Sequence, residues 1–217
     1  MQRLLSGPLL FCCLVMAPIP AATQPLTRLL SCEGPLRPDA SAVGLAKYFG
    51  ARNIRNADIY IGEGNSEPGT IVFDTSPLDR IEVLWIDPEA RTRPRAVTVR
   101  GSTLSPPASH WHTRRGLALG IRLRELERIN RRPFRLLGFG WDYGGTTMSW
   151  AGGTFDAEQP APCRTRARLE TGGLLTEERQ RWDRQVAGDI EFSSGHLAMQ
   201  ALDPYVYEIW LDYQPVR

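Results

Sequence analysis

The chain has 217 residues, of which 42% are hydrophobic and 23% are charged, a balance typical of a folded protein and too apolar for a disordered one. Its 26 basic and 24 acidic residues are mixed along the whole length and give a formal net charge of +2. No strongly basic surface is expected, so the composition argues against nucleic acid as a partner.

Residues 1–22 have the pattern of a secretory signal peptide. The single charge of Arg3 precedes an apolar run over residues 9–17, and small residues follow at Ala21 and Ala22. This run is about half of the ~20 residues that span a bilayer, and no later run approaches that length, so we expect no transmembrane segment. The sequence predicts a periplasmic or secreted protein, cleaved after Ala21 or Ala22, whose mature part, residues 23–217, forms a single domain.

Two of the four cysteines, Cys12 and Cys13, lie in the predicted signal peptide, which leaves Cys32 and Cys163 in the mature chain. An even number of cysteines in an oxidising compartment favours a disulfide between them. The alternative is two buried free thiols.

The first half of the mature chain predicts one short helix followed by strands. Asp39 or Ser41 can cap a helix that buries Val43, Ala46 and Phe49 and ends at Gly50. Alternating apolar residues and turn residues then predict strands over residues 58–62, 70–73, 80–86 and 96–99.

The second half begins with the same order of elements. A helix is expected over residues 117–130, with Leu126 and Ile129 buried and Asn130 in the place that Gly50 takes in the first helix. A strand over 134–143, a glycine turn and a partner strand over 146–150 follow. Because the order repeats, residues 41–87 and 117–155 are possible repeat units, each a helix followed by a β-hairpin.

Residues 163–213 predict a C-terminal sheet segment. Strands are expected over 164–169, 188–192 and 205–213, with a short helix that Thr176 caps. Large side chains on both faces of the last strand favour a central position in a sheet. Together, the predicted helices and strands indicate an α+β fold, an antiparallel sheet with short helices.

The most unusual segment is Gly138-Phe139-Gly140-Trp141-Asp142-Tyr143-Gly144-Gly145. As a strand, it would place Trp141 and Tyr143 on one face and Asp142 on the other. Such an aromatic pair can stack on a sugar or hold a peptide. The alternative is a twisted strand whose aromatic side chains fill the core.

This segment, preceded by Leu123-x-x-Leu126-Glu127 and Asn130-x-x-Pro133-Phe134, resembles a group of uncharacterised secreted bacterial proteins with a GFGWDYGG-type segment. No activity follows from that resemblance. The order of helix and hairpin is also similar, in arrangement only, to the β-lactamase inhibitor protein and to the small lipoprotein of the outer-membrane barrel assembly machine. Both bind other proteins, which implies a protein partner by analogy.

His110-Trp111-His112 places two imidazoles on one face of an extended segment, where they could bind a metal if His196 or a carboxylate joined them. Two histidines without a third ligand are weak evidence, so no metal and no cofactor is expected. Asp142 could also form a hydrolytic carboxylate pair with an acidic residue elsewhere in the chain, for which Glu63, Asp58 and Asp87 are the candidates.

The sequence therefore favours a non-catalytic binding protein of the bacterial envelope, with a protein or peptide ligand. The alternative is an envelope hydrolase that acts on glycan or peptide, with or without a metal. The candidate ligand-binding residues are Trp141, Asp142, Tyr143, His110, Trp111 and His112. A hydrolase requires Asp142 and the two histidines to meet in one cleft, whereas a binding protein does not.

Overall fold

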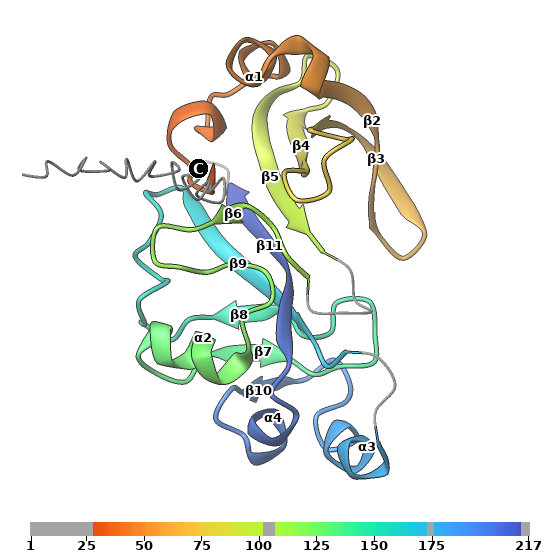
Figure 1. The fold of residues 1–217 in the computed structure, drawn as a ribbon, viewed down its shortest axis with the longest axis vertical. Coiled ribbons are helices and arrows are strands. Elements are labelled where there is room, and N and C mark those ends of the chain that lie inside the picture. Colours follow the sequence, from red (N-terminus) through yellow and green to blue (C-terminus); the bar gives the residue numbers. More distant parts are fainter. Residues whose placement is uncertain (1–27, 102–106, 173–175, 214–217) are drawn as a thin grey trace, which may run out of the picture.

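The computed structural model describes residues 28–101, 107–172 and 176–213. The predicted signal peptide lies outside these residues. The chain folds into short helices and mostly antiparallel strands, which confirms the predicted α+β class (Figure 1). None of the helices within the described residues has the length and apolar character needed to cross a membrane.

The largest sheet has six antiparallel strands in the order β2-β3-β4-β5-β11-β9. The position of β11 between β5 and β9 confirms that the last strand is central. The bounds of the six strands are β2 (Ile54–Gly62), β3 (Asn65–Val72), β4 (Ile81–Asp87), β5 (Thr92–Arg100), β11 (Tyr205–Tyr213) and β9 (Cys163–Glu170).

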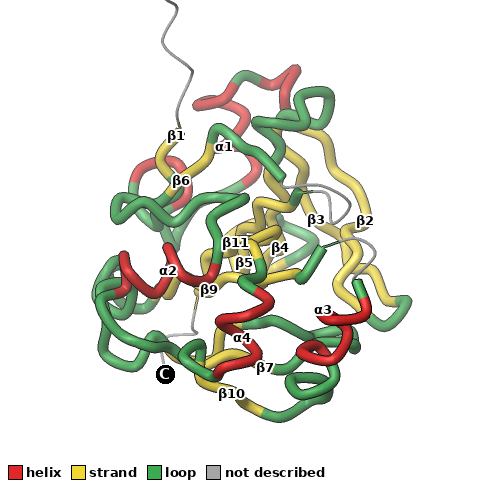
Figure 2. The backbone as a smooth tube through the Cα atoms, turned by 60° about the horizontal axis from the view of Figure 1, so that its bottom comes forward, coloured by secondary structure: helices red, strands yellow, loops and turns green. Residues whose placement is uncertain are grey.

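Two smaller sheets and four helices complete the fold. The strands β10 (Glu191–Ser193), β7 (Arg135–Leu137) and β8 (Thr147–Ser149) form one sheet, and β1 (Arg28–Leu29) pairs in parallel with β6 (Trp111–His112). The helices are α1 (Ala42–Phe49), α2 (Leu123–Asn130), α3 (Glu177–Asp183) and α4 (Leu197–Leu202), with 3-10 turns η1 (Gly34–Leu36) and η2 (Ala51–Asn53). Figure 1 shows α1 at the end of the molecule near β2 to β5 and α2 beside β7 and β8 in the other half, and Figure 2 shows α4 near β7 and β10.

The core lies on one face of the six-stranded sheet. Val83, Val97, Ile209 and Leu211 point to this face and are fully buried. They belong to one hydrophobic cluster with residues of α2, α4 and β7, namely Leu123, Leu126, Leu136, Met199 and Leu202. We call this the covered face, and the opposite face of the same strands the open face.

Helix α1 begins and ends as predicted but buries a different stripe. The Ser41 hydroxyl accepts a hydrogen bond from the Gly44 N–H at 3.1 Å, and Gly50 ends the helix at φ 90°. The predicted inward position of Val43 is wrong, because its side chain is 80% exposed. The contacts with the core come instead from Leu45, Ala42 and Phe49, which share one side of a helix with 3.6 residues per turn.

Helix α2 is shorter than predicted and starts at Leu123. Residues 117–122 contain a turn instead, and Gly120 N–H donates to the Val206 carbonyl of β11 at 2.8 Å. The left-handed residue at the end of the helix is Arg131 rather than Asn130. Asn130 is fully buried, and its side-chain amide donates to the Trp150 carbonyl at 3.0 Å.

Both possible repeat units contain a helix followed by two antiparallel strands. In the first unit, α1 precedes the long strands β2 and β3 at the edge of the six-stranded sheet. In the second, α2 precedes the short strands β7 and β8 of the three-stranded sheet. The order of elements agrees between the units, while the lengths of the strands and their sheets differ.

The predicted disulfide between Cys32 and Cys163 is present and lies in the core. It joins the segment after β1 to the start of β9 across 131 residues of sequence, with the two Cα atoms 6.4 Å apart. The side-chain carbonyl of Gln159 accepts a hydrogen bond from the Cys32 N–H at 3.1 Å. The two ends of the described chain are thus fastened to each other through β9 and its neighbour β11.

Side chains and turns, rather than a further strand, occupy the outer edge of β9. The indole N–H of Trp150 donates to the Thr165 carbonyl at 2.8 Å, and Ala167 N–H donates to the Thr147 hydroxyl oxygen at 2.9 Å. Leu169 N–H donates to the carbonyl of Gly145 at 3.0 Å. The backbone groups of β9 that point away from β11 therefore have partners at each of these positions.

Candidate functional site

The open face of the six-stranded sheet is hollowed into a groove of about 880 Å³. All six strands line this groove, together with residues from the segment 141–146. The covered face is filled by the core, so the groove is the large concave surface that the sheet leaves accessible. Its size lies in the range of ~300–1,000 Å³ that is usual for ligand sites.

Aromatic side chains form part of the floor of the groove. Trp210, at the middle of β11, is partly exposed there. A β-bulge between Val206 and Glu208 changes the alternation of β11, so that both Tyr207 and Glu208 line the groove. Burial raises the pKa of Tyr207, so its hydroxyl stays protonated even at alkaline pH.

Arginine side chains on the open face are paired with carboxylates of the same face. Arg100 Nη2 lies 3.0 Å from Glu208 Oε1, Arg166 Nε lies 3.1 Å from Asp212 Oδ2, and Arg95 Nη2 lies 2.7 Å from Glu67 Oε2. Both signs of charge therefore alternate along the groove.

Arg100 connects two carboxylates across the strands β4, β5 and β11. Besides Glu208, its guanidinium faces Glu82 Oε2 at 3.7 Å. Burial by itself lowers the pKa of Arg100, but attraction to Glu208 and Glu82 raises it above its ordinary value. Arg100 is therefore a fixed positive charge at the floor of the groove.

Residues 138–143, the second part of the strand predicted over 134–143, do not form a strand. The strand β7 ends at Leu137, and the following residues form turns because Gly140 and Gly145 take positive φ angles of 88° and 74°. At Gly138, a Cβ atom would lie only 2.5 Å from the Val186 carbonyl oxygen, so the close approach of these backbones requires glycine. The predicted strand over 134–143 is therefore present only as β7 (Arg135–Leu137), because the chain turns after it.

The turns nevertheless bring Trp141, Asp142 and Tyr143 to the groove. The rings of Trp141 and Tyr143 meet edge to face, with centroids 5.5 Å apart. Trp141 is partly buried and donates its indole N–H to the Gly138 carbonyl at 3.1 Å, while Tyr143 is 42% exposed. Asp142 also lines the groove, rather than pointing to the other side as the predicted strand required.

Asp142 connects its loop to the tip of the β2–β3 hairpin. Its carboxylate oxygen Oδ2 accepts a hydrogen bond from the Glu63 N–H at 2.9 Å, and Tyr143 lies against Gly62 of the same tip. On the other side, Arg168 of β9 donates to the carbonyls of Gly144 and Asp142. The loop therefore connects the two edge strands, β2 and β9, and forms one end wall of the groove.

His110, Trp111 and His112 lie elsewhere and do not line the groove. His110 Nδ1 is 3.0 Å from Asp79 Oδ1, and His112 Nδ1 is 3.0 Å from the Thr113 carbonyl oxygen. Trp111 is buried and donates its indole N–H to the Asp79 carbonyl at 2.7 Å. The structure thus separates the two groups of candidate residues that the sequence singled out.

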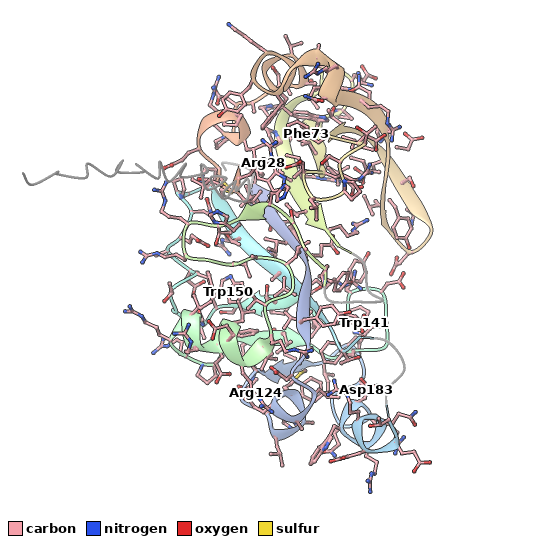
Figure 3. All side chains as sticks on the ribbon, viewed as in Figure 1. Arg28, Phe73, Arg124, Trp141, Trp150 and Asp183 are labelled. Atoms are coloured by element: carbon pink, nitrogen blue, oxygen red, sulfur yellow. A yellow bond between two sulfur atoms is a disulfide. The ribbon has the colours of Figure 1, made fainter. Side chains whose placement is uncertain are left out.

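The neighbours of these residues form a buried ion-pair cluster. Arg28 Nε lies 2.6 Å from Asp79 Oδ1, and its guanidinium lies 4.4 Å from the centroid of the Phe73 ring. Burial by itself raises the pKa of Asp79, but hydrogen bonds from Arg28, His110 and Ser76 lower it to about 2. Figure 3 shows Arg28 and Phe73 together and far from Trp141.

The described residues do not gather a metal-binding group of three or more histidine, cysteine, aspartate or glutamate side chains. His196, the possible third ligand, caps α4 by accepting a hydrogen bond from the Ala198 N–H at 3.2 Å. The carboxylate of Asp142 binds the backbone of Glu63, and that of Asp87 accepts from the Ala90 N–H at 3.0 Å.

Several groove residues were not singled out from the sequence. They are Arg100, Arg166, Arg168, Glu208 and Trp210. The sequence did contain one indication of the arginines. Over residues 164–168 they alternate with Thr165 and Ala167, as on a strand with one polar face. The partners of these arginines are far away in sequence, so their pairing was not visible before folding.

The chain matches no known family model, and no curated protein or solved structure shows significant similarity to it. The assignment of a site therefore rests on the residues of this chain alone.

Proposed function

We propose that the chain is a non-catalytic binding protein of the bacterial periplasm or cell exterior, and that its groove holds a segment of a protein or peptide. The observation that carries this proposal is the composition of the groove. Partly exposed aromatic side chains, Trp141, Tyr143 and Trp210, lie beside arginine–carboxylate pairs in one concave surface.

A polypeptide is the ligand class that fits this composition best. Its backbone offers both hydrogen-bond donors and acceptors, and its side chains carry both signs of charge. Paired groups such as Arg100 with Glu208 and Arg166 with Asp212 offer the matching partners on the groove floor. Rigid aromatic side chains add apolar contact area with little loss of conformational entropy on binding.

The position of the candidate residues favours binding over hydrolysis. A hydrolase using the sequence candidates needs Asp142, His110 and His112 in one cleft, whereas only Asp142 lines the groove. The disulfide between Cys32 and Cys163 is compatible with an oxidising compartment outside the cytoplasm.

Capture of partners from a cell-envelope extract tests the proposal, with the mature chain as bait and two groove variants, Trp141→Ala and Trp210→Ala. Each variant should weaken binding of the captured protein by ~2 kcal/mol or more, as central aromatic contacts do. The matched control is Tyr48→Ala, because Tyr48 is a 67% exposed aromatic on α1 that does not line the groove.

Partners are then compared across the variants by titration with the purified protein. A partner that binds the wild type and Tyr48→Ala equally, and the groove variants weakly, supports the groove as the site. If every captured partner binds Trp141→Ala and Trp210→Ala as tightly as it binds the wild type, the proposal is wrong.

A further inference from the structure

The edge strand β2 has backbone groups with no neighbouring strand. It lies at one end of the six-stranded sheet, and the described residues place no strand on its outer side. In the register of β2 with β3, the Phe73 N–H donates to the Asn53 carbonyl at 2.8 Å. Because successive residues of a strand turn their backbone groups to opposite sides, the odd-numbered residues of β2 face β3 and the even-numbered ones point outward. Asn56, Asp58 and Tyr60 therefore offer backbone donors and acceptors at this edge.

The side chains of this outward row carry unused polar groups. Asp58 is exposed, and its carboxylate forms no hydrogen bond or ion pair within the described residues. Asn56 is also exposed, and its Oδ1 atom accepts a hydrogen bond from the Thr70 hydroxyl at 3.0 Å. This bond leaves the side-chain N–H groups of Asn56 to donate. The edge therefore has an unused acceptor at Asp58 and an unused donor at Asn56.

A second copy of β2 has both of the matching groups. In an antiparallel pair, residues that point outward pair with residues that point outward, so the register between two copies can shift only by two residues. The register with its two-fold axis at Ala57 places Asn56 of each copy opposite Asp58 of the other. It also places Ile54 opposite Tyr60, which is 50% exposed and can pack against it.

The two neighbouring registers are less favourable. An axis at Asn56 places Asp58 opposite the apolar Ile54, so the carboxylate has no donor opposite it. An axis at Asp58 places two carboxylates opposite each other, which destabilises a pair of strands. With the axis at Ala57, no like charges are opposite each other, and two small alanine side chains form the central pair. The outward row of β2 is thus self-complementary in this register.

We propose that two copies of this chain associate through β2, antiparallel about a two-fold axis at Ala57. Asn56 and Asp58 of the two copies then exchange backbone hydrogen bonds, and the side-chain amide of Asn56 donates to the carboxylate of Asp58. The row of bonds ends at Ile54, whose N–H already donates to the Ala51 carbonyl. Because the axis is perpendicular to the sheet, the open faces of both copies lie on the same side, with one groove on each side of the axis.

Sedimentation equilibrium of the mature protein, without any ligand, tests the proposal. A strand pair of this length buries less surface than a standard-size interface, so we expect a weak dimer whose fraction rises over about 10 µM to 1 mM. Amide hydrogen exchange over the same range locates the contact. The outward N–H groups of Asn56, Asp58 and Tyr60 should become protected as the dimer forms. The Ala57 N–H, which faces β3, should keep the protection that it has in the monomer.

Exchanging the two polar residues tests the register. Asn56→Asp places two carboxylates opposite each other on both sides of the axis and should raise the Kd of the dimer by at least about tenfold. Asn56→Asp combined with Asp58→Asn restores an amide opposite each carboxylate, so this double variant should dimerise as tightly as the wild type. The matched control is Asn65→Asp, which makes the same change of charge at an exposed position of the same hairpin, outside the outward row of β2.

The proposal is overturned if the wild type stays monomeric up to about 1 mM, or if the protected amides lie outside β2. It is also overturned if the double variant dimerises as weakly as Asn56→Asp, or if Asn65→Asp weakens the dimer as much, because another register or surface would then form the contact. Thermal unfolding at low concentration verifies that each variant is folded. Since the measurement uses no ligand, its result is independent of the binding function proposed for the groove.

Discussion

The two faces of the six-stranded sheet are made by the same strands and differ in what covers them. On β11, Ile209 and Leu211 are fully buried, while Trp210 between them lines the groove. On β9, Ala167 is fully buried, and the adjacent Arg166 lines the groove. The alternation of a strand specifies two faces, but segments elsewhere in the chain, α2 and α4 above all, decide which face remains open.

Ion pairs of the two sides also differ in how much of their side chains is exposed to solvent. On the covered side, the ion pair of Arg28 and Asp79 is largely shielded from water, with 24% and 12% of the two side chains exposed. On the open face, the pair of Arg95 and Glu67 leaves 46% and 38% exposed. Solvent weakens the second pair, so the shielded pair should contribute more to the stability of the fold than the exposed one.

The largest effect is expected from the disulfide, which lies on the covered side. Replacing both Cys32 and Cys163 by alanine should lower the free energy of unfolding by up to ~4–5 kcal/mol, because the bond closes a long loop of 131 residues. Urea unfolding of the oxidised wild type and the double variant measures this. Wild-type protein treated with reductant is the control, and an unchanged unfolding midpoint would contradict the prediction.

The next effect compares neighbouring strands directly. Leu211→Ala removes a fully buried side chain of the covered face and should cost about 2–5 kcal/mol of stability. Thr98→Ala changes the open face of β5 and should cost less than about 1 kcal/mol. Equal losses in urea melts would mean that the two faces are not covered as described.

The buried ion pair predicts a dependence of stability on pH. The pKa of Asp79 is about 2 in the folded chain and 3.8 in the absence of neighbours, so the ionised form stabilises the fold by about 2 kcal/mol above pH ~4. This contribution is lost as the pH falls from about 4 to 2. Asp79→Asn should remove it at neutral pH and flatten the acid limb of a stability–pH curve. An unchanged acid limb would assign the acid sensitivity to other carboxylates.

The smallest effect is expected on the open face. Glu67→Gln removes the exposed pair with Arg95 and should change stability by less than about 0.5 kcal/mol at low salt. Thermal unfolding of both proteins with and without 1 M salt measures this change. At 1 M salt the Debye length is ~3 Å, so the exposed pair is screened. A loss as large as that of Asp79→Asn would remove the distinction between the two sides.

Much of the fold could be predicted because its strands have local signals. The strand Tyr205–Tyr213 was predicted with its correct bounds, and the cap at Ser41 follows from its hydroxyl alone. The helix α4 was missed, since six residues give little periodic signal and a helix this short depends on packing. Residues 138–143 were wrongly included in a strand, because the turns at these glycines depend on close backbone contacts with distant parts of the chain.

The candidate site was predictable only in part. Trp141 and Tyr143 were singled out by composition, and they line the groove although the strand expected to carry them is absent. The rest of the groove depends on pairs such as Arg100 with Glu208, which lie 108 residues apart. A single sequence does not contain the register that brings them together.

The closed outer edge of β9 has a consequence for how copies of this chain can associate. At the other end of the six-stranded sheet, the described part of the chain places no strand beside β2, whose backbone is therefore available on one side. Growth of a fibre by strand pairing needs two open edges in each copy, one to receive a neighbour and one to offer to the next. Since Trp150, Thr147 and Gly145 occupy one of the two, the six-stranded sheet offers a single edge among the described residues, that of β2, for pairing between copies.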